Sequence, residues 1–121
     1  MASDRDPQPD CLFCRIVRGD LPATKVADDD LVLAFQDIAP RSPTHVLVIP
    51  KVHIASAADL TDDDAVLLGR LFATVARIAR EAGIAEDGYR IVSNVGHWGG
   101  QTVDHLHLHL MGGRAFDWPP G

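Results

Sequence analysis

The feature that most constrains this chain is the alternation of three histidines with three leucines in DHLHLHLMGG, residues 104–113. Successive side chains of a β-strand point to opposite faces of the sheet, so the alternation predicts a strand with its leucines in a core and its histidines on the other surface. Neighbouring histidines there would lie about 6 to 7 Å apart, and the outer pair about 13 Å apart. One metal ion cannot bind all three without distortion, so either two of the histidines share a metal or different histidines have different roles.

A glycine-rich loop, GHWGGQT at 96–102, precedes the histidines. Gly100, Gln101 and Thr102 can offer backbone amides, a side-chain amide and a hydroxyl to an oxyanion. This favours phosphate chemistry, in which a neutral imidazole attacks phosphorus while neighbouring donors stabilise the phosphate oxygens. A competing hypothesis is a catalytic zinc site, with two histidines and a third ligand holding a metal-bound hydroxide. Spacing alone leaves both hypotheses open.

Two cysteines, Cys11 and Cys14, lie in CLFC. In a reducing cytosol this spacing favours a metal or redox role over a structural disulfide, but one such pair is only half of a zinc site. The motif itself leaves metal binding, inert thiols and redox chemistry open.

Length and charge limit the classes of function. The 121 residues fit one domain. Seventeen acidic against eleven basic residues give a net charge of -6, which argues against a general attraction to nucleic acid or anionic membranes. No apolar run approaches the roughly 20 residues that span a bilayer, and MASDRDPQPD lacks the apolar core of a signal peptide. We therefore expect a cytoplasmic protein.

The order of elements predicts an antiparallel α+β domain. Residues 1–10 are polar and carry two prolines, so we expect a flexible N-terminal tail followed by a single domain over 11–121. A long helix is predicted from Thr61, which with Asp64 resembles a capping box, to Gly83. The other expected elements are a short helix in LFCRIVRG and strands in TKVA, LVLAFQD, HVLVIP, YRIVSNVG and the histidine segment.

Several further residues have two interpretations. Asp37 is either a turn residue before Pro40 or a carboxylate that accepts hydrogen bonds from ribose hydroxyls. Asn94 either stabilises its loop or binds a ligand. Trp118, beside two prolines, is expected to dock on this domain or on a partner. Five apolar side chains are individually best explained as core, with the wall of a base pocket as the alternative: Phe13, Ile16, Leu21, Phe35 and Ile38.

Separated motifs together resemble the histidine triad family, most closely its Hint branch of nucleoside phosphoramidases. They are DIAP from Asp37, SPTHVLVIPKVH from Ser42, NVGHWGGQT from Asn94, HLHLHLM from His105 and the ending GGRAFDWPPG. The order of these motifs, spanning nearly everything from Cys11 to Gly121, makes the resemblance specific.

The resemblance implies a five-stranded antiparallel sheet with one long and one short helix, continued across a homodimer. It implies hydrolysis of the P-N bond of purine nucleoside 5'-phosphoramidates, with AMP-type substrates and a nucleotidyl-histidine intermediate. His107 matches the nucleophile, His109 and Thr102 match phosphate contacts, and His45 belongs to the same cluster. A dinucleoside polyphosphate hydrolase and a non-catalytic nucleotide-binding module are the alternatives.

The resemblance also implies the residues that bind the nucleotide. Asp37 would hold the ribose. Asn94, Gly100 and Gln101 would line the phosphate side. The base pocket would be formed by the apolar group Phe13, Ile16, Leu21, Phe35 and Ile38, and the segment around Trp118 would reach the partner's site.

Relatives that retain the cysteine pair hold a structural zinc, which at the matching positions implies the ligands Cys11, Cys14, His53 and His105. Catalysis would require no metal. Thr102 stands where many relatives have serine, and the bulky Trp98 occupies a variable part of the loop, so both are expected to affect the leaving group that fits.

Overall fold

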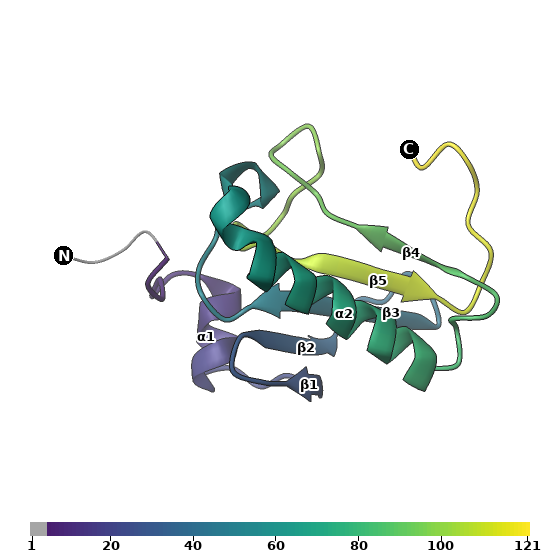
Figure 1. Ribbon diagram of the computed structural model, residues 1–121, viewed down its shortest axis with the longest axis horizontal. Coiled ribbons are helices and arrows are strands. Elements are labelled where there is room, and N and C mark those ends of the chain that lie inside the picture. Colours follow the sequence, from purple (N-terminus) through teal and green to yellow (C-terminus); the bar gives the residue numbers. More distant parts are fainter. Residues whose placement is uncertain (1–4) are drawn as a thin grey trace.

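The computed structural model describes residues 5–121, whose strands form one antiparallel sheet in the order β1-β2-β3-β5-β4 (Figure 1). The strands are β1 (Lys25–Asp28), β2 (Val32–Gln36), β3 (Thr44–Pro50), β4 (Tyr89–Val92) and β5 (Leu108–Gly112). With a short helix α1 (Leu12–Arg18) and a long helix α2 (Ala65–Glu81), they confirm the predicted α+β fold class. Within the described residues, no helix has the length and apolar character needed to cross a membrane.

The central strand β3 is buried on both faces of the sheet. Val46 and Val48 join the core beneath α2, whereas Leu47 and Ile49 join the core beneath α1. The alternation follows from the two-residue period of a strand. It also places His45 on the same face as Leu47, toward α1.

A capping box starts the segment that leads into α2, as the sequence predicts. The backbone N–H of Thr61 donates to the Asp64 carboxylate at 2.9 Å, and the N–H of Asp63 donates to Thr61 Oγ1 at 3.3 Å. The box opens a short 3-10 turn, Asp62–Asp64, before α2 itself begins at Ala65.

One face of α2 packs on the sheet, opposite the side occupied by α1. Its buried residues are Leu71, Thr74, Val75, Ile78 and Ala79. Ala82, which the helical spacing places on this face, is exposed, because α2 ends at Glu81 and the chain turns away through Gly83, whose φ is 75°. Only glycine adopts such a φ without steric cost.

Strand β5 is shorter than the predicted histidine strand and begins at Leu108. Ahead of it, the carbonyl of Pro50, at the end of the neighbouring β3, accepts a hydrogen bond from the His105 ring at 2.9 Å. The His105 side chain thus occupies the Pro50 carbonyl close to the place where the pairing of β3 with β5 ends, at Val48 and Leu108. The leucine and histidine faces persist through this segment, because Leu106, Leu108 and Leu110 all join the core beneath α2.

The N-terminal segment contacts the domain over the part that the structure describes. Arg5 makes a bidentate ion pair with Asp64, with N–O distances of 2.6 and 2.9 Å, and its carbonyl accepts the backbone N–H of His53 at 2.9 Å. The backbone N–H of Cys11 donates to the Gln8 carbonyl. Residues 1–4 of the predicted tail lie outside the described residues, and the flexibility of residues 1–10 stays a prediction.

We expect Asp64→Asn to lower the Tm by several degrees at pH 7. Arg5 and the N–H of Thr61 lower the pKa of Asp64 from 3.8 to about 2. Because the folded pKa is depressed, this stabilisation is present above pH 3.8 and is lost as the pH falls toward 2. The difference in Tm between wild type and variant should therefore disappear over that window. Thermal unfolding followed by circular dichroism measures it.

Asp62→Asn is the matched control, because Asp62 lies in the same turn and is exposed. An equal loss of Tm in both variants at pH 7 would contradict a specific role of the Arg5–Asp64 pair.

Candidate active site and metal centre

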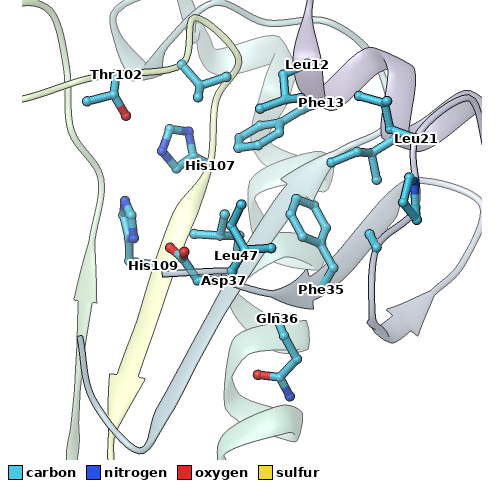
Figure 2. A pocket seen from close by; sticks show the side chains of 15 residues that line it. Leu12, Phe13, Leu21, Phe35, Gln36, Asp37, Leu47, Thr102, His107 and His109 are labelled. Atoms are coloured by element: carbon cyan, nitrogen blue, oxygen red, sulfur yellow. The ribbon is translucent and has the colours of Figure 1, made fainter. Parts of the chain in front are cut away.

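A cavity of about 360 Å³ opens between α1 and the α1-facing side of the sheet. Figure 2 shows its two kinds of wall, with His107, His109 and Thr102 on one side and apolar side chains such as Phe13 and Phe35 opposite. The lining residues are Leu12, Phe13, Ile16, Leu21, Pro22, Ala23, Phe35, Gln36, Asp37, Ile38, Leu47, Thr102, Val103, His107 and His109. Apolar walls with a few convergent polar groups are typical of small-molecule sites.

His107 is held in one tautomer by its own backbone. Its Nδ1 lies 2.7 Å from the carbonyl oxygen of His105, and since a carbonyl can only accept, Nδ1 carries the proton. The lone pair of a neutral ring is then on Nε2, the other ring nitrogen. His107 is buried except for 5% of its surface and lines the cavity, so the geometry suits a nucleophile.

A second pair of imidazoles forms a hydrogen-bonded chain beside His107. The backbone N–H of Arg41 donates to His45 Nδ1 at 3.0 Å, so neutral His45 carries its proton on Nε2. That nitrogen lies 2.9 Å from His109 Nδ1, which therefore accepts and leaves the His109 proton on Nε2. His109 can thus act as a hydrogen-bond donor in the cavity, which it lines.

Asp37 joins this chain, with its carboxylate 3.4 Å from His45 Nε2. Asp37, His45 and His109 are close enough to hold a metal ion. The protonated Nε2 of His45 has no lone pair to give, because its Nδ1 is already used to accept the Arg41 amide. The three groups are therefore better described as a hydrogen-bonded chain than as a metal site.

Burial keeps the two imidazoles of this hydrogen-bonded chain, His45 and His109, uncharged near neutral pH. Desolvation by burial is the main cause that lowers the pKa of His109 to about 4, with His107 and His45 adding to the shift and Asp37 opposing it. Burial also lowers the pKa of His45, against the attraction of Asp37.

Four metal-ligating side chains meet at the other end of the histidine segment. Ligand atoms of Cys11, Cys14, His53 and His105 all lie within 4.8 Å of one another. Helix α1 supplies both sulfurs, since Cys11 is its N-cap and Cys14 lies in its first turn. Two thiols and two imidazoles form a donor set suited to a closed, four-coordinate metal centre.

A hydrogen bond to the backbone orients the His105 ring toward the two thiols. Its Nε2 donates to the Pro50 carbonyl at 2.9 Å, which leaves the Nδ1 lone pair facing Cys11 Sγ at 3.3 Å and Cys14 Sγ at 3.6 Å. Such a bond to the second ring nitrogen is what commonly fixes a histidine ligand. Burial lowers the pKa of His105 to about 4, so the ring is neutral and its lone pair is available.

Residues 96–101 of the glycine-rich loop are braced by hydrogen bonds and do not line the cavity, whereas Thr102 at the end of the loop does. Gln101 accepts the N–H of Gly96 and donates to the carbonyls of Ala55 and Val103, while Asn94 donates to the Gly99 carbonyl. The side-chain amide of Gln101 is thus committed to the protein itself. The predicted nucleotide contacts of Asn94, Gln101 and also Gly100 stay predictions.

The structure brings most of the other predicted site residues together. Those at the cavity are His107, His109, Thr102, Asp37, Phe13, Ile16, Leu21, Phe35 and Ile38, and His45 reaches it through His109. Phe13, Ile16 and Phe35 are core and cavity wall at once. Ile38 is fully exposed at the rim, and Trp118 is 83% exposed and lies outside the lining.

Sequence reasoning missed other lining residues, among them Leu47 and Gln36. The two-residue period of β3 could have found Leu47, because it places Leu47 on the face of His45. The Arg41 amide, which fixes the His45 tautomer, had no signal in the sequence, since any residue other than proline offers the same N–H.

Comparison with known proteins assigns the family. The sequence model of the protein family described as the HIT domain matches residues 18–116 of the chain. This chain belongs to the HIT family. The assignment confirms the resemblance to histidine triad proteins, and the chain is a HIT-family hydrolase of the histidine triad type.

Relatives in the HIT family cover nearly the whole chain. An uncharacterised HIT-like protein of Synechococcus elongatus is 53% identical over 93% of this chain and 97% of its own length. The purine nucleoside phosphoramidase of Escherichia coli is 47% identical over 85% of this chain and 87% of its own.

Solved structures of HIT proteins share the fold. A HIT family hydrolase from Legionella pneumophila has a TM-score of 0.91 and 52% identity, covering 93% of this chain and all of that one. A histidine triad protein from Clostridium difficile has a TM-score of 0.87 and 41% identity, covering 91% and 96% of the two chains.

The partly buried imidazole of His109 should make stability depend on pH. Its folded pKa of about 4 lies below the ordinary 6.5, so the folded state binds fewer protons than the unfolded state between these values. Its contribution is therefore present above pH 6.5 and is lost as the pH falls toward 4. We expect the difference in Tm between wild type and His109→Asn to shrink by about 5 °C as the pH falls from 6.5 to 4.

His97→Asn is the control, because His97 is exposed on the glycine-rich loop. A Tm difference for His109→Asn that stays constant from pH 7 to 4 would contradict the lowered pKa of His109.

Proposed function

We propose that this protein hydrolyses the P-N bond of purine nucleoside 5'-phosphoramidates, releasing the nucleoside monophosphate and an amine. The observation that carries the proposal is the 2.7 Å hydrogen bond from His107 Nδ1 to the His105 carbonyl, which leaves Nε2 as a nucleophile in the wall of a nucleotide-sized cavity. The name of the Escherichia coli relative supports the choice of substrate.

The reaction we propose has two steps. The Nε2 lone pair of His107 forms a bond to phosphorus as the P-N bond to the leaving amine breaks, which gives a nucleotidyl-histidine. Water then attacks phosphorus and frees the nucleoside monophosphate and His107. The departing nitrogen must gain a proton and the attacking water must lose one.

Neighbouring groups are suited to stabilise the phosphate. His109 is a donor through Nε2 because its Nδ1 accepts from His45. The hydroxyl of Thr102 lies at the same cavity. Donors placed where negative charge develops account for much of phosphoryl-transfer catalysis. An uncharged His109 avoids repulsion with His107 when that ring becomes cationic in the intermediate.

The apolar wall opposite the histidines suits a purine base. Phe13 and Phe35 meet edge to face, with centroids 5.4 Å apart, and Leu21 and Ile16 extend the wall. We propose that Asp37, between this wall and the histidines, accepts hydrogen bonds from the ribose hydroxyls (Figure 2). Asp37 Oδ1 meanwhile accepts the N–H of Ala39, which holds the carboxylate in place.

We also propose a homodimer joined through strand β4. This strand ends the sheet, so its outer backbone groups have no partner strand within the described residues. Ile91 on β4 is 36% exposed and Trp118, in the segment that follows β5, is 83% exposed. A second copy would satisfy the strand edge and cover apolar surface together.

We propose that the Cys/His cluster, formed by Cys11, Cys14, His53 and His105, binds zinc. Zinc is the common ion in tetrahedral sites with two thiolates and two imidazoles, where its role is to cross-link the fold. The four protein ligands would fill all positions of a tetrahedral ion and would leave none open for water, so we propose that the reaction at His107 requires no metal. A C-x-x-C pair that binds a metal is typical of a reducing compartment, which supports the cytoplasmic location that we propose.

We expect His107→Ala to lower kcat for an adenosine phosphoramidate by at least about 10³-fold, because it removes the atom that attacks phosphorus. Wild type quenched during turnover should carry one nucleotidyl group, located on His107 by mass spectrometry. His97→Ala, on the exposed loop, is the control and should keep its activity.

Equal hydrolysis by wild type and His107→Ala would contradict the nucleophile assignment. Faster turnover of a dinucleoside polyphosphate than of the phosphoramidate would identify the protein as a dinucleoside polyphosphate hydrolase. AMP binding without any His107-dependent turnover would identify a binding module.

We expect one zinc ion per chain in wild type and none in Cys14→Ser, measured by elemental analysis after gel filtration. Loss of the ion removes a cross-link between α1 and the two histidine segments, so the Tm should also fall. His97→Ala should keep its zinc. Abolition of turnover by chelation, in a chain that remains folded and binds AMP, would instead support a zinc-dependent hydrolase.

A further inference from the structure

Phe13 lies between the Cys/His cluster and the catalytic histidine. Its ring contacts His105 with centroids 5.8 Å apart and His107 with centroids 5.2 Å apart, both edge to face. It is 4% exposed and also walls the cavity. The same ring therefore touches a candidate metal ligand, the proposed nucleophile and the nucleotide pocket.

The position of Phe13 depends on α1, which carries both cysteines. Cys14 Sγ lies 3.3 Å from His53 Nδ1, and both thiols approach His105 Nδ1. An ion held by these four side chains would join α1 to the segments of His53 and His105. Because α1 has only seven residues, tertiary contacts and not helix propensity determine where it sits.

A second connection runs through the backbone of His105. The carbonyl of His105 accepts from His107 Nδ1, while the ring of His105 faces the thiols. A change in the His105 ring can therefore reach His107 either through Phe13 or through this carbonyl.

We propose that Phe13 is a positioning residue that couples metal binding at the Cys/His cluster to nucleotide binding and to the orientation of His107. When the four ligands hold an ion, α1 fixes the Phe13 ring against His107 and completes the pocket wall. Without the ion, α1 and Phe13 have more freedom, and the nucleotide must order them. The coupling is reciprocal, so the nucleotide should also strengthen metal binding.

The test uses the full chain, with Zn²⁺ and AMP as probes. We expect AMP to bind the zinc-loaded chain about tenfold more tightly than the chelated chain, measured by calorimetry, a change typical of coupled sites. Saturating AMP should slow the release of zinc to a competing chromogenic chelator. The release measurement starts from the loaded chain and so remains valid if the chelated chain unfolds.

Phe13→Leu and Phe35→Leu form a matched pair. Both substitutions replace an aromatic side chain in the wall of the same pocket with a smaller aliphatic one. Phe35 contacts Phe13 but, among the described residues, makes no ring contact with a histidine. We expect both variants to bind AMP more weakly. Phe35→Leu should keep the tenfold effect of zinc, whereas in Phe13→Leu the effect should fall below twofold and AMP should no longer slow zinc release.

The ring of His107 offers a readout that loss of packing alone would not move. We expect the imidazole ¹⁵N and ¹H signals of His107 to shift on zinc loading in wild type and in Phe35→Leu, and to shift much less in Phe13→Leu. An equal effect of zinc in all three chains would overturn the role of Phe13 and assign the coupling to the His105 carbonyl or to folding.

This inference rests on the proposed nucleotide pocket, and the two can fail separately. Failure of AMP to bind zinc-loaded wild type would contradict the proposed function. Binding of AMP with the same affinity to loaded and chelated wild type, with no effect on zinc release, would contradict the coupling alone.

Discussion

The hydrogen bonds of His105 are the interactions on which the rest of the site depends. The side chain is completely buried, and its Nε2 is anchored to the Pro50 carbonyl at the end of β3. This anchor turns Nδ1 toward the cysteines, while the backbone carbonyl of the same residue sets the tautomer of His107. One residue thus fixes both the orientation of a candidate metal ligand and the tautomer of the proposed nucleophile, and it does so from the segment just before β5, where the ladder with β3 has ended.

The two faces of the sheet have different roles. The long helix α2 covers one face with a continuous aliphatic core. The other face is covered only in part by the short helix α1, which leaves the cavity open beside His107 and His109. A rigid core on one side and a partly open surface on the other is a physical basis for holding imidazoles accurately while admitting a ligand.

Much of the fold could be predicted because local patterns and tertiary packing agree. The capping box at Thr61, the helical spacing after it and the β-branched runs each appear where expected. The sequence-based predictions failed where a long-range contact overrides a local pattern. The alternation at 104–113 reads as one strand, yet the ladder starts at Leu108, since the His105 side chain turns to the Pro50 carbonyl instead. Similarly, nothing local in Arg5 predicts its ion pair with Asp64.

The sequence by itself determined which chemical groups are present and which face of the sheet the histidines share, because residue type and the two-residue period are local properties. Only the tertiary structure decided what each imidazole can do. The Pro50 carbonyl and the Cys11 thiol reach His105 from distant segments, and His45 reaches His109 from the neighbouring strand. A histidine's tautomer follows from the partner that each ring nitrogen meets. Those partners exist only once the sheet has formed and α1 has packed against it.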